Sequence, residues 1–184
     1  MRIEVRNMVC RHCVQALENA LRELDIPYRE VGIGYADTVS ALSVPQLRSL
    51  DAALAELGFG RIDSAEQSLV ERAKRAVMHH VRDEAECRLK LSACIEEQVG
   101  VSFDTISRMF SQLEGRTIEK YHIAQKVERV KELLAYGGRT LEEIADITGY
   151  SSASHLSRQF KAVTGLTPTQ FVSTRGKRTP LDKV

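Results

Sequence analysis

The 184-residue chain lacks the features that mark membrane and secreted proteins. It contains no run of about 18 apolar residues, so we expect no membrane-spanning segment. The N-terminal stretch from Met1 to Glu4 includes two charged residues and does not begin a secretory signal, which has an apolar core. A cytoplasmic location is therefore expected.

The sequence also lacks the usual patterns of catalysis and has no excess charge of either sign. No Ser-His-Asp arrangement, phosphate-binding glycine loop or paired-carboxylate site stands out, so we do not expect an enzyme. The net charge is +1, but it is unevenly distributed. Residues 1–64 hold 7 basic and 9 acidic residues (net −2), whereas residues 89–184 hold 14 and 11 (net +3). A basic second half permits contact with phosphate without establishing it.

What the chain does contain is a segment that occurs twice. Ser107-Arg108-Met109-Phe110 is repeated fifty positions later as Ser157-Arg158-Gln159-Phe160. Each copy follows a short apolar-periodic stretch that ends in glycine, at Gly100 and at Gly149. A helix, a turn and a second helix, present twice, predict a DNA-binding region with two recognition helices.

The second half of the chain has helical periodicity throughout. Helices are predicted at 90–99, 102–113, 117–136, 140–148 and 152–164, with a last short helix that begins at Pro168. Together they form an all-α domain over 89–175 with two helix-turn-helix units, and a polar tail over 176–184. A helix over 65–88 is expected to connect this domain to the first.

A recognition helix needs apolar residues on its inner face and long polar residues on its outer face, where base edges are read. Arginine at matching places of both copies favours base reading over a solvated surface, since arginine is the commonest reader of guanine. Asp104 could instead accept from a cytosine amino group or repel phosphate, and His155 could be a solvated surface residue. The candidate DNA-binding residues are Asp104, Thr105, Ser107, Arg108, Gln112, Ser154, His155, Ser157, Arg158 and Lys161.

Residues 89–173 resemble the DNA-binding domain of AraC/XylS-type transcription regulators. The match runs from Gly149-Tyr150-Ser151-Ser152 through Leu156-Ser157-Arg158-Gln159-Phe160-Lys161 to Gly165-Leu166-Thr167-Pro168-Thr169-Gln170-Phe171. The resemblance implies that the 117–136 helix holds two reading units, which enter successive major grooves of double-stranded DNA about one helical turn apart. Proteins of this type often dimerise through their additional domain, so the sequence leaves a homodimer open.

Residues 1–64 show a second chemical motif, Cys10-Arg11-His12-Cys13. The two thiols lie where a helix is expected to begin, and a helix N-terminus favours the thiolate form that binds metal. Two soft sulfur ligands suit Cu(I), with His12 as a third candidate ligand. Zinc would require four ligands, which this region does not offer.

The remaining pattern of residues 1–64 predicts an α+β domain with the element order βαββαβ. Strands are expected at 3–9, 28–33, 38–44 and 59–63, and helices at 12–25 and 45–57. The domain resembles the heavy-metal-associated domain of copper chaperones and metal-transport ATPases, whose M-x-C-x-x-C motif Met8, Cys10 and Cys13 match. The resemblance implies a ferredoxin-like fold and a buried Met8. Asn7 stands where that family usually has glycine.

These features together predict a transcription regulator of AraC/XylS type whose first domain senses a soft metal ion such as Cu(I), with no cofactor strictly required. A thiol or redox sensor at the same cysteines is an alternative. So is a domain retained without a ligand. A metal carrier is disfavoured, because carrying a metal requires no duplicated DNA-binding helices.

Overall fold

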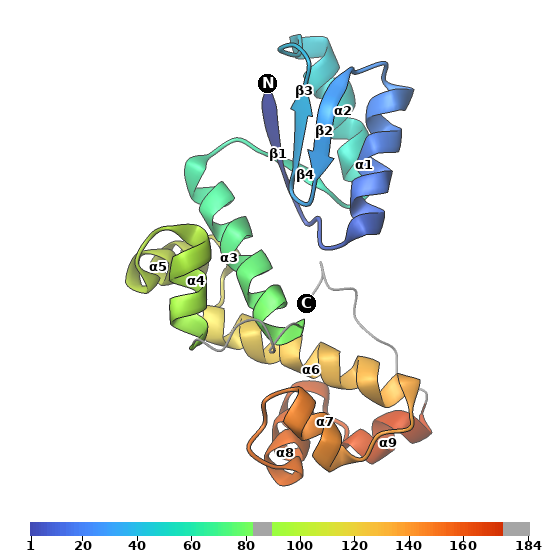
Figure 1. Cartoon of the computed structure of the whole chain (residues 1–184), viewed down its shortest axis with the longest axis vertical. Helices are drawn as coiled ribbons and strands as arrows, with labels where there is room; N and C mark the ends of the chain where they lie inside the picture. Colours follow the sequence, from blue (N-terminus) through green and yellow to red (C-terminus); the bar gives the residue numbers. More distant parts are fainter. Residues whose placement is uncertain (83–89, 175–184) are drawn as a thin grey trace. The chain divides into compact units, whose positions relative to one another are not determined.

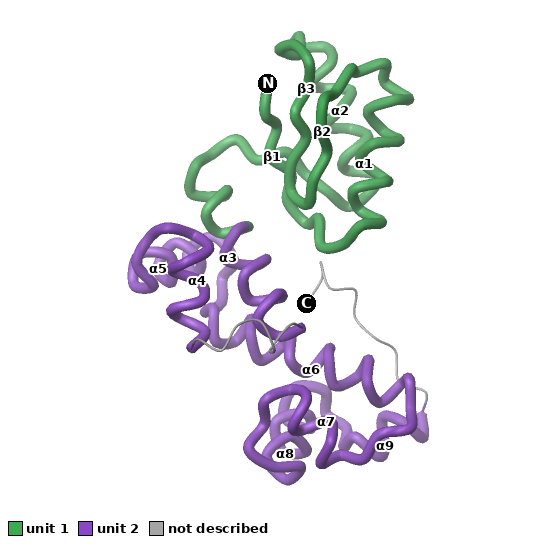
Figure 2. Tube along the Cα trace, in the orientation of Figure 1, with its two compact units in different colours: residues 1–71 green, residues 72–184 purple. Residues whose placement is uncertain are grey.

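The computed structural model describes residues 1–82 and 90–174, and the chain divides into two compact units, Met1–Glu71 and Arg72–Val184 (Figure 2). The division falls inside one helix, α3, which runs from Ala65 to Arg82. The end of the predicted connecting helix and the predicted polar tail lie outside the described residues. None of the helices in the described part of the chain combines the length and apolar character needed to cross a bilayer.

The first unit is a four-stranded antiparallel sheet with two helices (Figure 1). Its elements are β1 (Arg2–Arg6), α1 (Arg11–Glu23), β2 (Tyr28–Gly32), β3 (Tyr35–Thr38), α2 (Val44–Glu56) and β4 (Gly60–Ile62). The strands are ordered β2-β3-β1-β4. Alternate residues of β1, Ile3 and Val5, pack with Leu17 and Leu21 of α1 and Leu50 of α2. Met8 is also buried in this core, as predicted.

The prediction of a third strand over 38–44 was wrong. The strand lies earlier, because Gly32 pairs with Tyr35 and leaves only Ile33 and Gly34 between β2 and β3. Gly34, the second residue of this turn, has a φ of +88°, a conformation that glycine adopts without strain. Gly34 therefore closes the hairpin and places β3 directly after β2.

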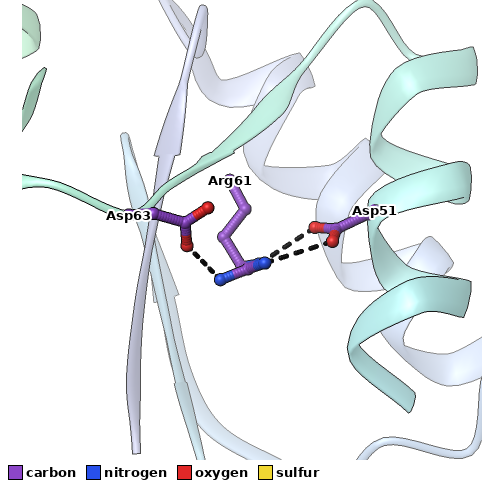
Figure 3. Close-up of polar contacts among 3 residues, drawn as sticks. All are labelled: Asp51, Arg61 and Asp63. Carbon is purple, nitrogen blue, oxygen red and sulfur yellow. Dashed lines mark hydrogen bonds and ion pairs between the residues drawn. The ribbon is translucent and has the colours of Figure 1, made fainter. Parts of the chain in front are cut away.

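A charged contact ties α2 to β4 (Figure 3). Arg61 of β4 donates from Nε to Asp51 Oδ1 of α2 at 2.9 Å and from Nη2 to Oδ2 at 3.2 Å, and it also contacts Asp63. The hydrogen bond to Asp51 raises the pKa of the Arg61 guanidinium. The two-point contact fixes the short last strand, which has only three residues, against the helix.

The second unit contains, after its share of α3, six further helices in the described residues. They are α4 (Leu91–Val99), α5 (Phe103–Glu114), α6 (Ile118–Tyr136), α7 (Leu141–Ile147), α8 (Ala153–Thr164) and α9 (Pro168–Ser173). Each begins and ends within one residue of the predicted bounds where these were given, since glycine and capping residues mark the ends in the sequence. The long helix α6 contacts α5 as well as α7, α8 and α9.

Two histidines meet where α3 and α6 approach each other. The rings of His80 and His122 have centroids 5.7 Å apart. Burial, followed by the charge of Lys126, lowers the pKa of His122 to about 4 and lowers that of His80. Both rings are therefore neutral at pH 7 in the folded chain.

We expect the folded chain to lose stability in mild acid because of this pair. An unfolded histidine takes up a proton near pH 6.5, whereas His122 in the folded chain stays neutral down to about pH 4. The free energy of unfolding should therefore fall as pH drops from 6.5 towards 4, by up to about 1.4 kcal/mol per pH unit from this group. Urea unfolding at several pH values measures the slope. The variant His122→Asn should show a shallower slope, and an unchanged slope would assign the effect to other groups.

Candidate nucleic-acid interface

The two predicted recognition helices, α5 and α8, begin and end in the same way. Ser102 and Ser152 are their N-caps, and each hydroxyl accepts a hydrogen bond from the backbone N–H three residues on, at 3.4 and 3.1 Å. Gly115 and Gly165 end the helices with φ of +67° and +77°. Such caps satisfy terminal backbone groups that a helix leaves without partners. Both helices are therefore delimited by the repeated residues themselves.

The repeat extends to the packing. From Ser102 to Phe110 and from Ser152 to Phe160, the sequence of exposed, half-buried and buried positions is identical. Ile106 and Phe110 are buried in α5, as Leu156 and Phe160 are in α8. Corresponding residues of the two copies therefore face the same side of their helices.

An aromatic pair holds each recognition helix to the helix that follows it. Phe110 of α5 lies 5.5 Å from Tyr121 of α6, and Phe160 of α8 lies 5.6 Å from Phe171 of α9, measured between ring centroids. Tyr121 and Phe171 are also fifty positions apart. The short helix α9 is thus the counterpart of the first turn of α6.

The predicted DNA-binding residues lie on the accessible sides of α5 and α8. None of them is buried, and Arg108 and Arg158 are both exposed. Neither arginine side chain forms a hydrogen bond or ion pair within residues 1–82 and 90–174. Their guanidinium groups are thus available to an external acceptor, while their role in reading bases stays a prediction. The exposed members are Asp104, Arg108, Gln112, Ser154, Arg158 and Lys161, and the half-buried ones are Thr105, Ser107, His155 and Ser157.

In the second helix-turn-helix, the ring of His155 contacts an aromatic ring, whereas the corresponding residue of the first helix-turn-helix has no ring. The ring of Tyr150 meets the ring of His155 edge to face, with centroids 5.4 Å apart and an interplanar angle of 88°. Ser151 Oγ lies 3.1 Å from His155 Nδ1. At the corresponding position of α5 stands Thr105, which hydrogen-bonds to its cap Ser102. Sequence reasoning identified His155 but missed the tyrosine beside it, because their contact crosses the turn.

The two cysteines of the first unit lie at the start of α1. Cys10 is the N-cap residue, Cys13 lies in the first turn, and their Sγ atoms are 3.6 Å apart. Both are half-buried, whereas His12 is exposed. No group of three or more metal-ligating side chains occurs among the residues that the structure describes. The structure thus brings the two thiols together and does not make His12 part of a three-ligand cluster.

The residue ahead of the cysteine loop has a special backbone conformation. Asn7 has a φ of +69°, a left-handed conformation that asparagine tolerates better than most residues. Its backbone N–H donates to Glu71 Oε2 of α3 at 3.3 Å, and its side-chain Nδ2 donates to the Gly58 carbonyl at 3.0 Å. The loop that carries the cysteines is therefore anchored to α3, a contact that the sequence did not predict.

Comparison with known proteins bears on the second unit. Residues 95–174 match the family model described as a helix-turn-helix domain. The xylose operon regulatory protein of Escherichia coli K12 is 28% identical over 105 residues, which cover 57% of this chain and 26% of that protein. The protein of the same description from Haemophilus influenzae is 23% identical over 197 residues, covering 92% and 51%. This chain thus spans about a quarter to a half of the length of these relatives.

Solved structures agree with the helical arrangement. The C-terminal domain of AraT, a response regulator from Geobacillus stearothermophilus, superposes with a TM-score of 0.53 at 28% identity, covering 62% of this chain and 91% of that one. A Chromobacterium violaceum transcriptional regulator of the AraC-type DNA-binding class gives a TM-score of 0.54 at 22% identity, covering 64% and 100%, which shows the fold alone. Residues 95–174, with their duplicated caps, cores and aromatic pairs, are thus similar to this helix-turn-helix domain family.

Proposed function

We propose that this chain is a sequence-specific DNA-binding transcription regulator. The observation that carries the proposal is the matched pair of recognition helices, in which Arg108 and Arg158 occupy equivalent, exposed positions. The related proteins are described as regulators, which favours this function over an enzyme. A single exposed arginine is commonplace, but two at equivalent places of duplicated units favour base reading.

The spacing of the two helix-turn-helix motifs supports contact with successive major grooves of double-stranded DNA. The connecting helix α6 has 19 residues and is therefore about 28 Å long. Successive major grooves on one face of DNA recur about every 34 Å. Because α5 packs against the start of α6 and α8 contacts α6 as well, one chain can present both recognition helices to an asymmetric site.

We expect Arg158→Ala to cost about 1–3 kcal/mol of binding free energy on a cognate site and to relax one base position. Arg108→Ala should do the same at a position about one turn away. Fluorescence anisotropy with cognate and random duplexes measures both effects. Arg139→Ala, an exposed cation outside both recognition helices, is the control and should affect the two duplexes equally. An equal loss on cognate and random DNA for Arg158→Ala would refute base reading by this residue.

We further propose that the first unit has a ferredoxin-like fold and senses a soft metal ion such as Cu(I). The βαββαβ order and the close pair of Sγ atoms at the start of α1 support this. Two thiolates suit Cu(I), which accepts few soft ligands. A redox response of the same two thiols is the second candidate, favoured by their 3.6 Å separation.

Changing both Cys10 and Cys13 to Ser should abolish Cu(I) binding and leave the fold intact, because serine keeps the size of the side chain but not the soft ligand. Competition with a colorimetric Cu(I) chelator under reducing conditions gives the stoichiometry, and circular dichroism gives the fold. Met78→Leu, which removes a buried sulfur atom of the second unit, is the control and should not alter the stoichiometry. Undiminished copper binding by the double variant would place the site elsewhere.

The contact between Asn7 and Glu71 offers a route from the cysteine loop to the second unit. Glu71 is buried on α3, and α3 continues without a break into residues of the second unit. The next residue, Arg72, donates from Nη2 to the Gln98 carbonyl at the end of α4, at 2.6 Å. A shift of the loop that carries Cys10 would thus act on a helix that also holds the first helix-turn-helix.

If this route operates, Glu71→Ala should leave Cu(I) stoichiometry unchanged but remove the effect of Cu(I) on DNA affinity. The reason is that the loop loses its hydrogen-bond acceptor on α3. Duplex affinity measured with and without Cu(I) gives the comparison. Glu66→Ala, an exposed position on the same helix, is the matched control and should keep the wild-type response. A full copper response in Glu71→Ala would contradict the route.

A further inference from the structure

Lys126 of α6 contacts the turn of the second helix-turn-helix twice. Its Nζ donates to the Gly149 carbonyl at 3.0 Å and lies 4.1 Å from the centroid of the Tyr150 ring. Gly149 directly follows the C-cap residue of α7, Thr148, where a cation is favoured by the helix dipole. One side chain therefore fixes both the backbone and the aromatic ring of this turn.

Tyr150 passes this constraint on to the recognition helix. The ring is buried, and its hydroxyl has no hydrogen-bond partner among the described residues. Lys126 Nζ lies over the Tyr150 ring, and the His155 ring of α8 meets the same ring at right angles. Together with Ser151, Tyr150 restricts the orientation of the His155 imidazole. Lys126 therefore contacts Tyr150, and Tyr150 in turn contacts His155.

The groups around Lys126 do not compete with it for this role at neutral pH. His80 and His122 lie close enough for the charge of Lys126 to lower their pKa, after burial, which has the larger effect. Both rings are therefore uncharged at pH 7, so neither repels Lys126 from the turn.

In the first helix-turn-helix a cationic side chain also donates to a backbone carbonyl near the turn, but it does not contact an aromatic ring there. Arg72 of α3 donates to the Gln98 carbonyl near the end of α4, as Lys126 does to Gly149 after α7. The turn that follows, Gly100-Val101, contains no aromatic residue, and Thr105 stands in place of His155. Lys126 and Arg72 can therefore be compared directly, because both donate to a carbonyl near a turn but only Lys126 also contacts an aromatic ring of its turn.

We propose that Lys126 is a positioning residue for base recognition by the second helix-turn-helix, acting through Tyr150 on the side chain of His155. The proposal rests on the DNA-binding function proposed above. The residue makes no contact with bases itself. It acts by holding the turn and the ring against which His155 is set.

The test is selection of bound sequences from a random duplex pool with the full chain, followed by affinity measurements on single-base variants of the selected site. Lys126→Met keeps the length of the side chain but removes the charge and the donor. It should reduce discrimination roughly 3- to 10-fold at bases in the half-site read by α8, and leave the other half-site unchanged. Arg72→Met should affect only the half-site read by α5.

Two further variants separate positioning from general stability. Lys126→Arg should restore discrimination, since it can still cap the carbonyl and lie over the ring. Tyr150→Phe keeps the ring and removes only its hydroxyl, so it should retain wild-type discrimination. Equal losses at both half-sites in Lys126→Met, or none, would overturn the proposal while leaving the regulator function standing. Failure of the wild-type chain to select any sequence would refute both.

Discussion

The helix-turn-helix unit depends on one contact that occurs twice, the packing of a buried phenylalanine of the recognition helix against an aromatic ring of the next helix. Phe110 with Tyr121 and Phe160 with Phe171 have nearly the same ring separation. Each pair fixes which side of its recognition helix is buried and so which side faces outwards. The equivalence of Arg108 and Arg158 follows from this packing, because both arginines lie two residues before the anchoring phenylalanine.

Much of this unit could be predicted because its information is local. Serine and threonine caps, glycines after the helices and a 3.6-residue apolar period mark the helices in the sequence itself. The third strand of the first unit was predicted too far along the chain. Residues 38–44 mix apolar with small polar residues, but the Gly34 turn decides where the hairpin closes. The contacts of Lys126 with Tyr150 and of His80 with His122 join residues far apart in the chain, so no local pattern predicts them.

The two units differ in how much their structure says about function. In the second, duplication supplies an internal comparison, and one difference between the copies is His155 in place of Thr105. In the first, the chemistry rests on two thiols and on an asparagine that anchors their loop to α3 through Glu71. A contact of this kind gives α3 a role beyond that of a linker, because the same helix carries residues of both units.

The central claim is that one chain reads two major grooves with two equivalent helices. Selection of duplexes from a random pool by the full chain, in the absence of metal, tests it most directly. The account predicts an enriched motif made of two different blocks whose centres are about 10 base pairs apart. A motif with one block only, or an inverted repeat that requires two chains, would contradict it.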